Sequence, residues 1–103
     1  KVRALSPADA AARRSAGDIT VVDVRPPEER AQASLAGDFR TLDAGPGSLE
    51  SLPKDTPLAF LCHHGSRSAS AAEHFRQLGF TQVHNVTGGI DAWADFDTSI
   101  PKY

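Results

Sequence analysis

The only cysteine of the chain, Cys62, lies between a short apolar run and a stretch of small and polar residues. The run at residues 58–61 follows two prolines and is typical of a short buried strand. From Ala69 onward the apolar residues recur on one face of a helix, at Ala71, Ala72, Phe75 and Leu78. The sequence therefore predicts a lone thiol in a tight turn between a strand and the N-terminus of a helix.

This placement favours the thiolate form of Cys62. The first N–H groups of a helix lack intrahelical partners and carry the positive end of its dipole, so they stabilise a nearby anion. Gly65 allows the loop to curl until its N–H groups converge, and Arg67 adds a permanent positive charge. Because a thiolate attacks electrophiles, we interpret Cys62 as a nucleophile. The alternative is a buried cysteine that only packs, as a small apolar residue does.

Composition limits the kind of protein. The chain has 103 residues, enough for one domain, which we predict to span residues 1–103. Hydrophobic residues make up 40% and charged residues 23%, with a net charge of −2, so no basic field indicates nucleic-acid binding. No segment is typical of a signal peptide or a membrane span. A single cysteine cannot form an internal disulfide, which is compatible with the cytoplasmic location that we predict.

Helical and strand patterns alternate along the chain, which predicts an α/β fold with a mostly parallel sheet covered on both faces. The first helix is expected to start at Ser6, whose side chain can cap it, with Pro7 in the first turn. Strands are expected at residues 19–24, 39–42, 58–61 and 82–86, and further helices at 26–30, 49–52, 69–78 and 90–93.

The carboxyl ends of parallel strands meet at one edge of the sheet, where ligands collect. Cys62 follows one predicted strand, and Asp23 and Arg25 lie at the end of another, so we expect all three at the same edge. Asp23 and Arg25 are interpreted first as structural residues, an acid and a base that pair with loop groups and hold the rim of the site in place. The alternative gives Arg25 a share in attracting an anionic substrate.

Three motifs in this order resemble a single-domain rhodanese: Asp-Val-Arg at residues 23–25, Cys-His-His-Gly-Ser-Arg-Ser at 62–68, and Gly-Gly-Ile-Asp-Ala-Trp at 88–93. The resemblance extends from Leu5 to Trp93. It implies a sheet of about five strands and a nucleophilic Cys62 that carries sulfane sulfur as a persulfide. It further implies that Asp23 supports the site, and that a substrate-binding loop is formed by His63, His64, Gly65, Ser66, Arg67 and Ser68. The sequence departs from the family at residues 34–38, where a histidine before a glycine-alanine pair is common.

The expected reaction begins with attack of the Cys62 thiolate on the outer sulfur of a small anionic donor such as thiosulfate. Arg67 and the loop N–H groups hold the anion, and sulfite leaves. Cyanide in an assay, or a small-molecule or protein thiol in the cell, then removes the sulfur. We expect no cofactor, and no metal either, since a cysteine followed directly by two histidines cannot readily converge on one tetrahedral ion.

The remaining histidines and the tryptophan have simpler interpretations. His63 and His64 are expected to line the rim or face solvent, with a direct role in the chemistry as the alternative. His74 and His84 are predicted at the surface, and Trp93 is predicted to anchor the core.

Two other functions stay open. Protein tyrosine phosphatases and the phosphatases of this fold use a loop with five residues between cysteine and arginine. Here four residues separate Cys62 from Arg67, and the longer motif's arginine position holds Ser68. The shorter loop forms a smaller cup that suits one sulfur atom better than a phosphoryl group, so a phosphatase or arsenate reductase is the enzymatic alternative. The other alternative is a non-catalytic docking module of the same fold.

Overall fold

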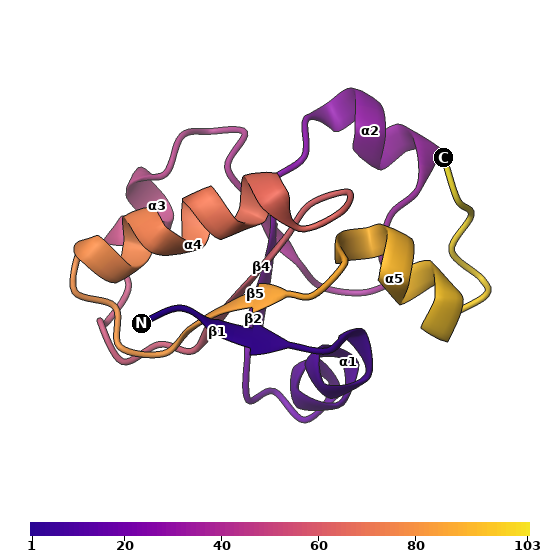
Figure 1. The fold of residues 1–103 in the computed structure, drawn as a ribbon. Coiled ribbons are helices and arrows are strands. Elements are labelled where there is room, and N and C mark those ends of the chain that lie inside the picture. Colours follow the sequence, from indigo (N-terminus) through magenta and orange to yellow (C-terminus); the bar gives the residue numbers. More distant parts are fainter.

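The computed structural model describes residues 1–103 as strands alternating with helices (Figure 1). Ser6 caps the first helix as predicted, because its Oγ accepts a hydrogen bond from the N–H of Asp9 at 3.1 Å. The elements are β1 (Arg3–Leu5), α1 (Pro7–Ser15), β2 (Thr20–Asp23), α2 (Pro27–Gln32), β3 (Arg40–Thr41), α3 (Gly47–Glu50), β4 (Leu58–Leu61), α4 (Ser66–Gln77), β5 (Val83–Val86) and α5 (Gly89–Phe96).

The five strands form one sheet in the order β1-β5-β4-β2-β3, and every neighbouring pair is parallel. All four residues of β4 are fully buried, as expected of a central strand with apolar side chains on both faces. The prediction of an α/β fold with about five strands is confirmed. The sheet brings the carboxyl ends of β2 and β4 side by side, with Asp23 paired to Leu61 in the register.

Helices cover both faces of the sheet (Figure 1). Alternate residues of β4 point to opposite faces: Phe60 packs against Phe75 of α4, with ring centroids 5.0 Å apart, and Leu61 belongs to the cluster that contains Trp93 of α5. Only 2% of Trp93 is exposed, which confirms it as a core residue. None of the helices has the length and apolar composition needed to cross a membrane.

Several elements differ from the sequence-based expectation: α3 lies two residues earlier, α5 ends three residues later, and α4 and β1 differ in ways that bear on the site and the sheet. Helix α4 starts at Ser66, three residues before the predicted start, because Gly65 takes the N-cap position with a φ of 111° and its carbonyl accepts from the N–H of Ala69. The small, polar residues after Gly65 are therefore the first turn of the helix and not part of the loop. Strand β1 was not predicted, since three residues are too few to show an alternating pattern.

His84 was predicted at the surface, and this prediction is wrong, because only 4% of the residue is exposed. Strand alternation turns its ring toward α1. There Nδ1 lies 3.1 Å from the carbonyl oxygen of Leu58, and Nε2 lies 3.3 Å from a guanidinium nitrogen of Arg13. The carbonyl can only accept, so Nδ1 carries the proton and Nε2 accepts from Arg13. His74 is exposed, as predicted.

Candidate active site

Cys62 lies directly after β4, and the N-terminus of α5 is hydrogen-bonded to the backbone at the start of the loop. The N–H of Ile90 donates to the carbonyl of Cys62 at 2.8 Å, and the N–H of Asp91 donates to the carbonyl of His63 at 3.0 Å. These bonds satisfy two helix N–H groups that have no intrahelical partner. Helix α5 therefore fixes the direction in which the Cys62 side chain leaves the strand.

The Cys62 sulfur is almost fully buried and accepts hydrogen bonds from the loop. The N–H of Gly65 lies 3.1 Å from Sγ, and the hydroxyl of Ser68 lies 3.2 Å from it. Burial opposes ionisation of the thiol, but the hydrogen bonds from Ser68, Gly65 and His64 outweigh it and lower the pKa of Cys62 below its ordinary value. The geometry thus favours a buried thiolate within a ring of N–H and O–H donors.

Asn85 of β5 orients two members of this ring. Its Nδ2 donates to the carbonyl of Gly65 at 3.0 Å, and its Oδ1 lies 2.6 Å from the Ser68 hydroxyl. Ser68 has one hydroxyl proton, so it donates either to Asn85 or to the Cys62 sulfur, which lies 3.2 Å away. Sequence reasoning missed Asn85. Asn85 gave no distinct signal, since it follows another polar residue, His84, in β5.

Asp23 and Arg25 form a buried ion pair at the end of β2. The Arg25 side chain donates to both carboxylate oxygens of Asp23, with distances of 2.6 to 3.2 Å, and both side chains are fully buried. Another guanidinium nitrogen of Arg25 donates to the hydroxyl of Tyr103 at 3.0 Å. The two residues thus bond chiefly to each other and not to loop groups, and the Arg25 guanidinium is not presented to solvent.

Arg67 reaches across the rim to Glu29 of α2. Its two terminal nitrogens donate to the two carboxylate oxygens of Glu29 at 2.8 and 2.9 Å. The hydroxyl of Tyr103 donates to the same carboxylate at 2.7 Å. The hydrogen bonds from Arg67 and then Tyr103 lower the pKa of Glu29 to about 2, so it is ionised at neutral pH. A helix was predicted at residues 26–30, but Glu29 was given no role in the site, and Tyr103 was missed.

The two histidines after Cys62 stack on each other. The ring centroids of His63 and His64 are 3.9 Å apart, and His63 also stacks on Tyr103 at 3.8 Å. His63 has a buried Nε2 without a hydrogen-bond partner, whereas His64 is exposed, as is Ser66. The two rings thus form a stack with Tyr103 beside Cys62, in which only His64 is exposed.

One possible metal-ligand atom each from His63, His64 and Asp91 lies within 4.8 Å of the others. Convergence of the ligand atoms of two adjacent histidines in this way was not expected from the sequence. The lone pairs of an imidazole lie in the ring plane, and these planes are inclined by only 27°. Side-by-side lone pairs cannot point at one tetrahedral ion, so the rings do not form a zinc site in this arrangement.

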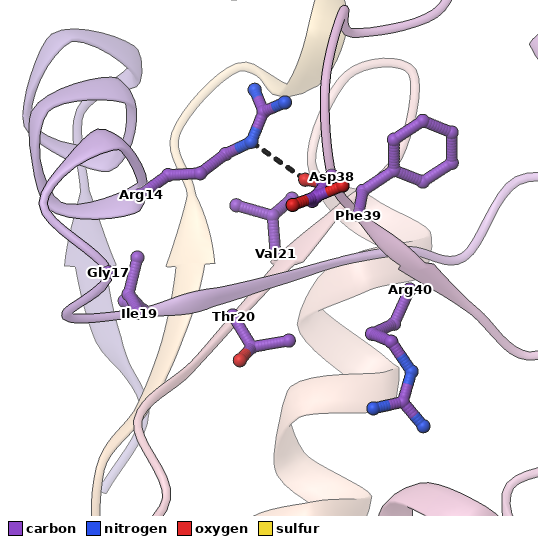
Figure 2. A pocket seen from close by; sticks show the side chains of 8 residues that line it. All are labelled: Arg14, Gly17, Ile19, Thr20, Val21, Asp38, Phe39 and Arg40. Carbon is purple, nitrogen blue, oxygen red and sulfur yellow. Dashed lines mark hydrogen bonds between the residues drawn. The ribbon is translucent and has the colours of Figure 1, made fainter.

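A cavity of about 310 Å³ lies at the opposite edge of the sheet, beside the start of β2 (Figure 2). Arg14 and Arg40 line it, and Arg14 donates to the carbonyl of Asp38 at 2.8 Å. The side chain of Arg14 also donates to the carbonyl of Ala36, so it holds the segment that departs from the rhodanese pattern. The cavity shares no residue with the Cys62 site.

The chain is similar to one protein family, and to named proteins and solved structures. The model of the rhodanese-like domain family matches residues 6–96. Thiosulfate sulfurtransferase GlpE of Stutzerimonas stutzeri is 35% identical over 91 residues, which cover 86% of this chain and 82% of that protein. The solution structure of a polysulfide-sulfur transferase homodimer from Wolinella succinogenes is similar with a TM-score of 0.77 and 28% identity, covering 99% of this chain and 80% of that one. A protein of unknown function and possible tyrosine phosphatase from Rhodopseudomonas palustris is similar with a TM-score of 0.73 and 29% identity, covering 99% and 85%.

Proposed function

Because the chain belongs to the rhodanese-like family, we propose that it is a sulfurtransferase that carries sulfane sulfur as a persulfide on Cys62. The observation that carries this proposal is the donor ring around the Cys62 sulfur, with the Gly65 N–H at 3.1 Å and the Ser68 hydroxyl at 3.2 Å. Such donors stabilise the attacking thiolate and, after transfer, the terminal sulfur of a persulfide. Two relatives named for sulfur transfer support the same class of reaction.

In the first half of the proposed reaction, the Cys62 thiolate attacks the outer sulfur of a donor such as thiosulfate. A bond forms between Sγ and that sulfur, the sulfur–sulfur bond of the donor breaks, and its electron pair leaves with sulfite. The charge on Cys62 moves to the new terminal sulfur. The loop N–H groups face this charge before and after the step, so little reorganisation is needed.

In the second half, a thiophilic acceptor removes the terminal sulfur and regenerates the Cys62 thiolate. The chain has no second cysteine, so no internal thiol can release the sulfur by forming a disulfide. We therefore expect an external acceptor, either cyanide in the assay or a small-molecule or protein thiol in the cell. A cytoplasmic location stays a prediction.

Phosphatase activity is the alternative, and one relative is a possible tyrosine phosphatase. The present loop offers little to a phosphoryl group. Ser68 occupies the position of the arginine in the longer phosphatase loop, and both terminal nitrogens of Arg67 are bonded to Glu29. The three equatorial oxygens of a phosphoryl group carry negative charge and require a free guanidinium, which this loop would not supply.

Steady-state assays test the proposal. We expect thiosulfate:cyanide turnover in the wild-type protein, none in Cys62→Ser, and no release of phosphate from an aryl phosphate. Ser70→Ala, an exposed change on the first turns of α4, is the control and should keep wild-type turnover. Turnover that survives in Cys62→Ser would contradict the mechanism. Phosphate release without sulfur transfer would favour the phosphatase, and inactivity in both assays would favour a docking module.

A further inference from the structure

The Arg67 guanidinium, which the sequence suggested as an anion-binding group, is neutralised by Glu29. Both of its terminal nitrogens are used by the carboxylate, at 2.8 and 2.9 Å. The Arg67 side chain is 45% exposed and the Glu29 side chain 24%, so the pair lies at the surface of the rim. An incoming anion therefore meets an ion pair there and not a free cation.

Glu29 itself is held firmly in place. The Tyr103 hydroxyl donates to it at 2.7 Å and in turn accepts from Arg25 at 3.0 Å. Tyr103 also stacks on His63, the residue next to Cys62, so the carboxylate is linked to the loop by direct contacts. Arg25 cannot supply the missing positive charge, because its guanidinium is paired with Asp23.

A dianionic donor has two ways to bind near Cys62, and both are unfavourable. It can displace Glu29 from Arg67, which breaks two charge-assisted hydrogen bonds and leaves a carboxylate beside a dianion. It can instead bind beside the intact pair, where the repulsion of Glu29 offsets the attraction of Arg67. A donor whose transferable sulfur is carried by an uncharged organic group has at most one negative charge, so it depends less on a free cation, and the N–H groups of the loop stay available to it.

We propose that Glu29 is a specificity-determining residue that makes Cys62 discriminate against dianionic donors such as thiosulfate and favours organic persulfides on an uncharged carrier. This inference rests on the proposed sulfurtransferase function. With a persulfide R–S–SH, the Cys62 thiolate bonds to the outer sulfur, the bond between the two donor sulfurs breaks, and its electron pair leaves with R–S⁻. The outer sulfur keeps its hydrogen, so the products are Cys62–S–SH and R–S⁻, with no external oxidant or reductant.

The test measures the second-order rate constant for adding one sulfur atom to Cys62, followed by intact-protein mass spectrometry. The donors are thiosulfate and the persulfide of N-acetylcysteine methyl ester, which has an uncharged carrier. We expect Glu29→Gln to raise the thiosulfate rate constant about tenfold, since removing a carboxylate near a dianion relieves two units of repulsion. The rate constant for the persulfide should rise clearly less, because that donor carries at most one negative charge and thiosulfate carries two.

Glu28→Gln is the matched control. It makes the same chemical change one residue away on an exposed side chain, and it should leave the rate constants for both donors unchanged. A Glu29→Gln protein that reacts more slowly with thiosulfate would overturn the inference, since Glu29 would then serve to position Arg67. Equal changes for both donors, or for Glu28→Gln and Glu29→Gln, would overturn it as well. Absence of sulfur on wild-type Cys62 with either donor would instead overturn the sulfurtransferase proposal on which this one rests.

Salt provides a second measurement that needs no variant to fold. Because the Arg67–Glu29 pair has no net charge, the wild-type rate constant for thiosulfate should not fall as the ionic strength rises, and neither should that for the persulfide. A thiosulfate rate constant that falls as salt is added would show net attraction by the rim and would overturn the inference.

Discussion

Gly89 packs directly against the His63 carbonyl: a Cβ at this glycine would lie 2.4 Å from the His63 oxygen. Gly89 also has a φ of 63°, which disfavours any other residue. We expect Gly89→Ala to lower the free energy of unfolding by about 3 kcal/mol, since it adds a clash to backbone strain. It should also slow persulfide formation on Cys62, because the bonds from α5 to the loop must lengthen.

Gly17→Ala is the control for this prediction. Gly17 also has a positive φ, of 76°, but nothing lies within 4 Å of an added Cβ. Strain alone should cost about 1 kcal/mol and leave the rate unchanged. Urea unfolding of both variants checks the difference, and equal losses of stability would contradict a specific role for the contact between Gly89 and the loop.

Asp23 is the partner of a fully buried guanidinium, so its charge matters for stability. Asp23→Asn leaves Arg25 without a countercharge, and we expect a loss of about 3 kcal/mol in the free energy of unfolding. The same carboxyl-to-amide change at Glu73, whose ion pair with Arg76 is exposed, should not change the unfolding midpoint. Similar midpoints for the two variants would show that the Asp23–Arg25 pair does not stabilise the rim.

Ser68 helps to lower the pKa of Cys62, so its removal should raise that pKa. In Ser68→Ala the thiolate fraction at pH 7 falls, and the rate of alkylation by iodoacetamide should fall about tenfold, since a hydrogen bond to a charged group contributes about 1.5–3 kcal/mol. The pH profile of alkylation should move toward higher pH, with its high-pH plateau little changed. An unshifted profile would contradict the hydrogen bond, and Ser70→Ala should behave as the wild type.

His84 makes stability depend on pH. Burial, only partly offset by the hydrogen bond to Leu58, lowers its pKa in the folded state below the ordinary value of 6.5. The unfolded chain therefore takes up a proton that the folded protein does not. Stability is present above pH 6.5 and is lost as the pH falls from there toward the lower folded-state pKa. Chemical unfolding between pH 7.5 and about 5.5 should show this loss in the wild type and in His74→Gln, but much less of it in His84→Gln. An equal slope in His84→Gln would contradict the assignment.

The motifs of the chain predicted the position of Cys62 after a strand, and the strand edge that it shares with Asp23, because these depend on local signals. A β-branched strand that ends in Asp23 and an apolar strand that ends in Cys62 must share an edge when both strands are parallel. Gly65, with its positive φ, marked the turn correctly. The start of α4 was placed too late because serines favour both loops and helix N-termini.

The parts of the site that the sequence did not predict depend on contacts between distant residues. Tyr103 reaches Glu29 across 74 positions, and Asn85 reaches Ser68 across 17, so no local pattern could reveal either contact. The burial of His84 likewise depends on α1 packing over β5. Arg67 was predicted to hold the anionic donor, and the carboxylate of Glu29 that pairs with it could be found only once the fold was known.

Persulfide formation on Cys62 is tested most directly by intact-protein mass spectrometry after incubation with thiosulfate or an organic persulfide. We predict a gain of about 32 Da, one sulfur atom, which cyanide removes and which Cys62→Ser prevents. An unchanged mass with both donors, or a gain that persists in Cys62→Ser, would contradict the assignment of Cys62 as the sulfur carrier.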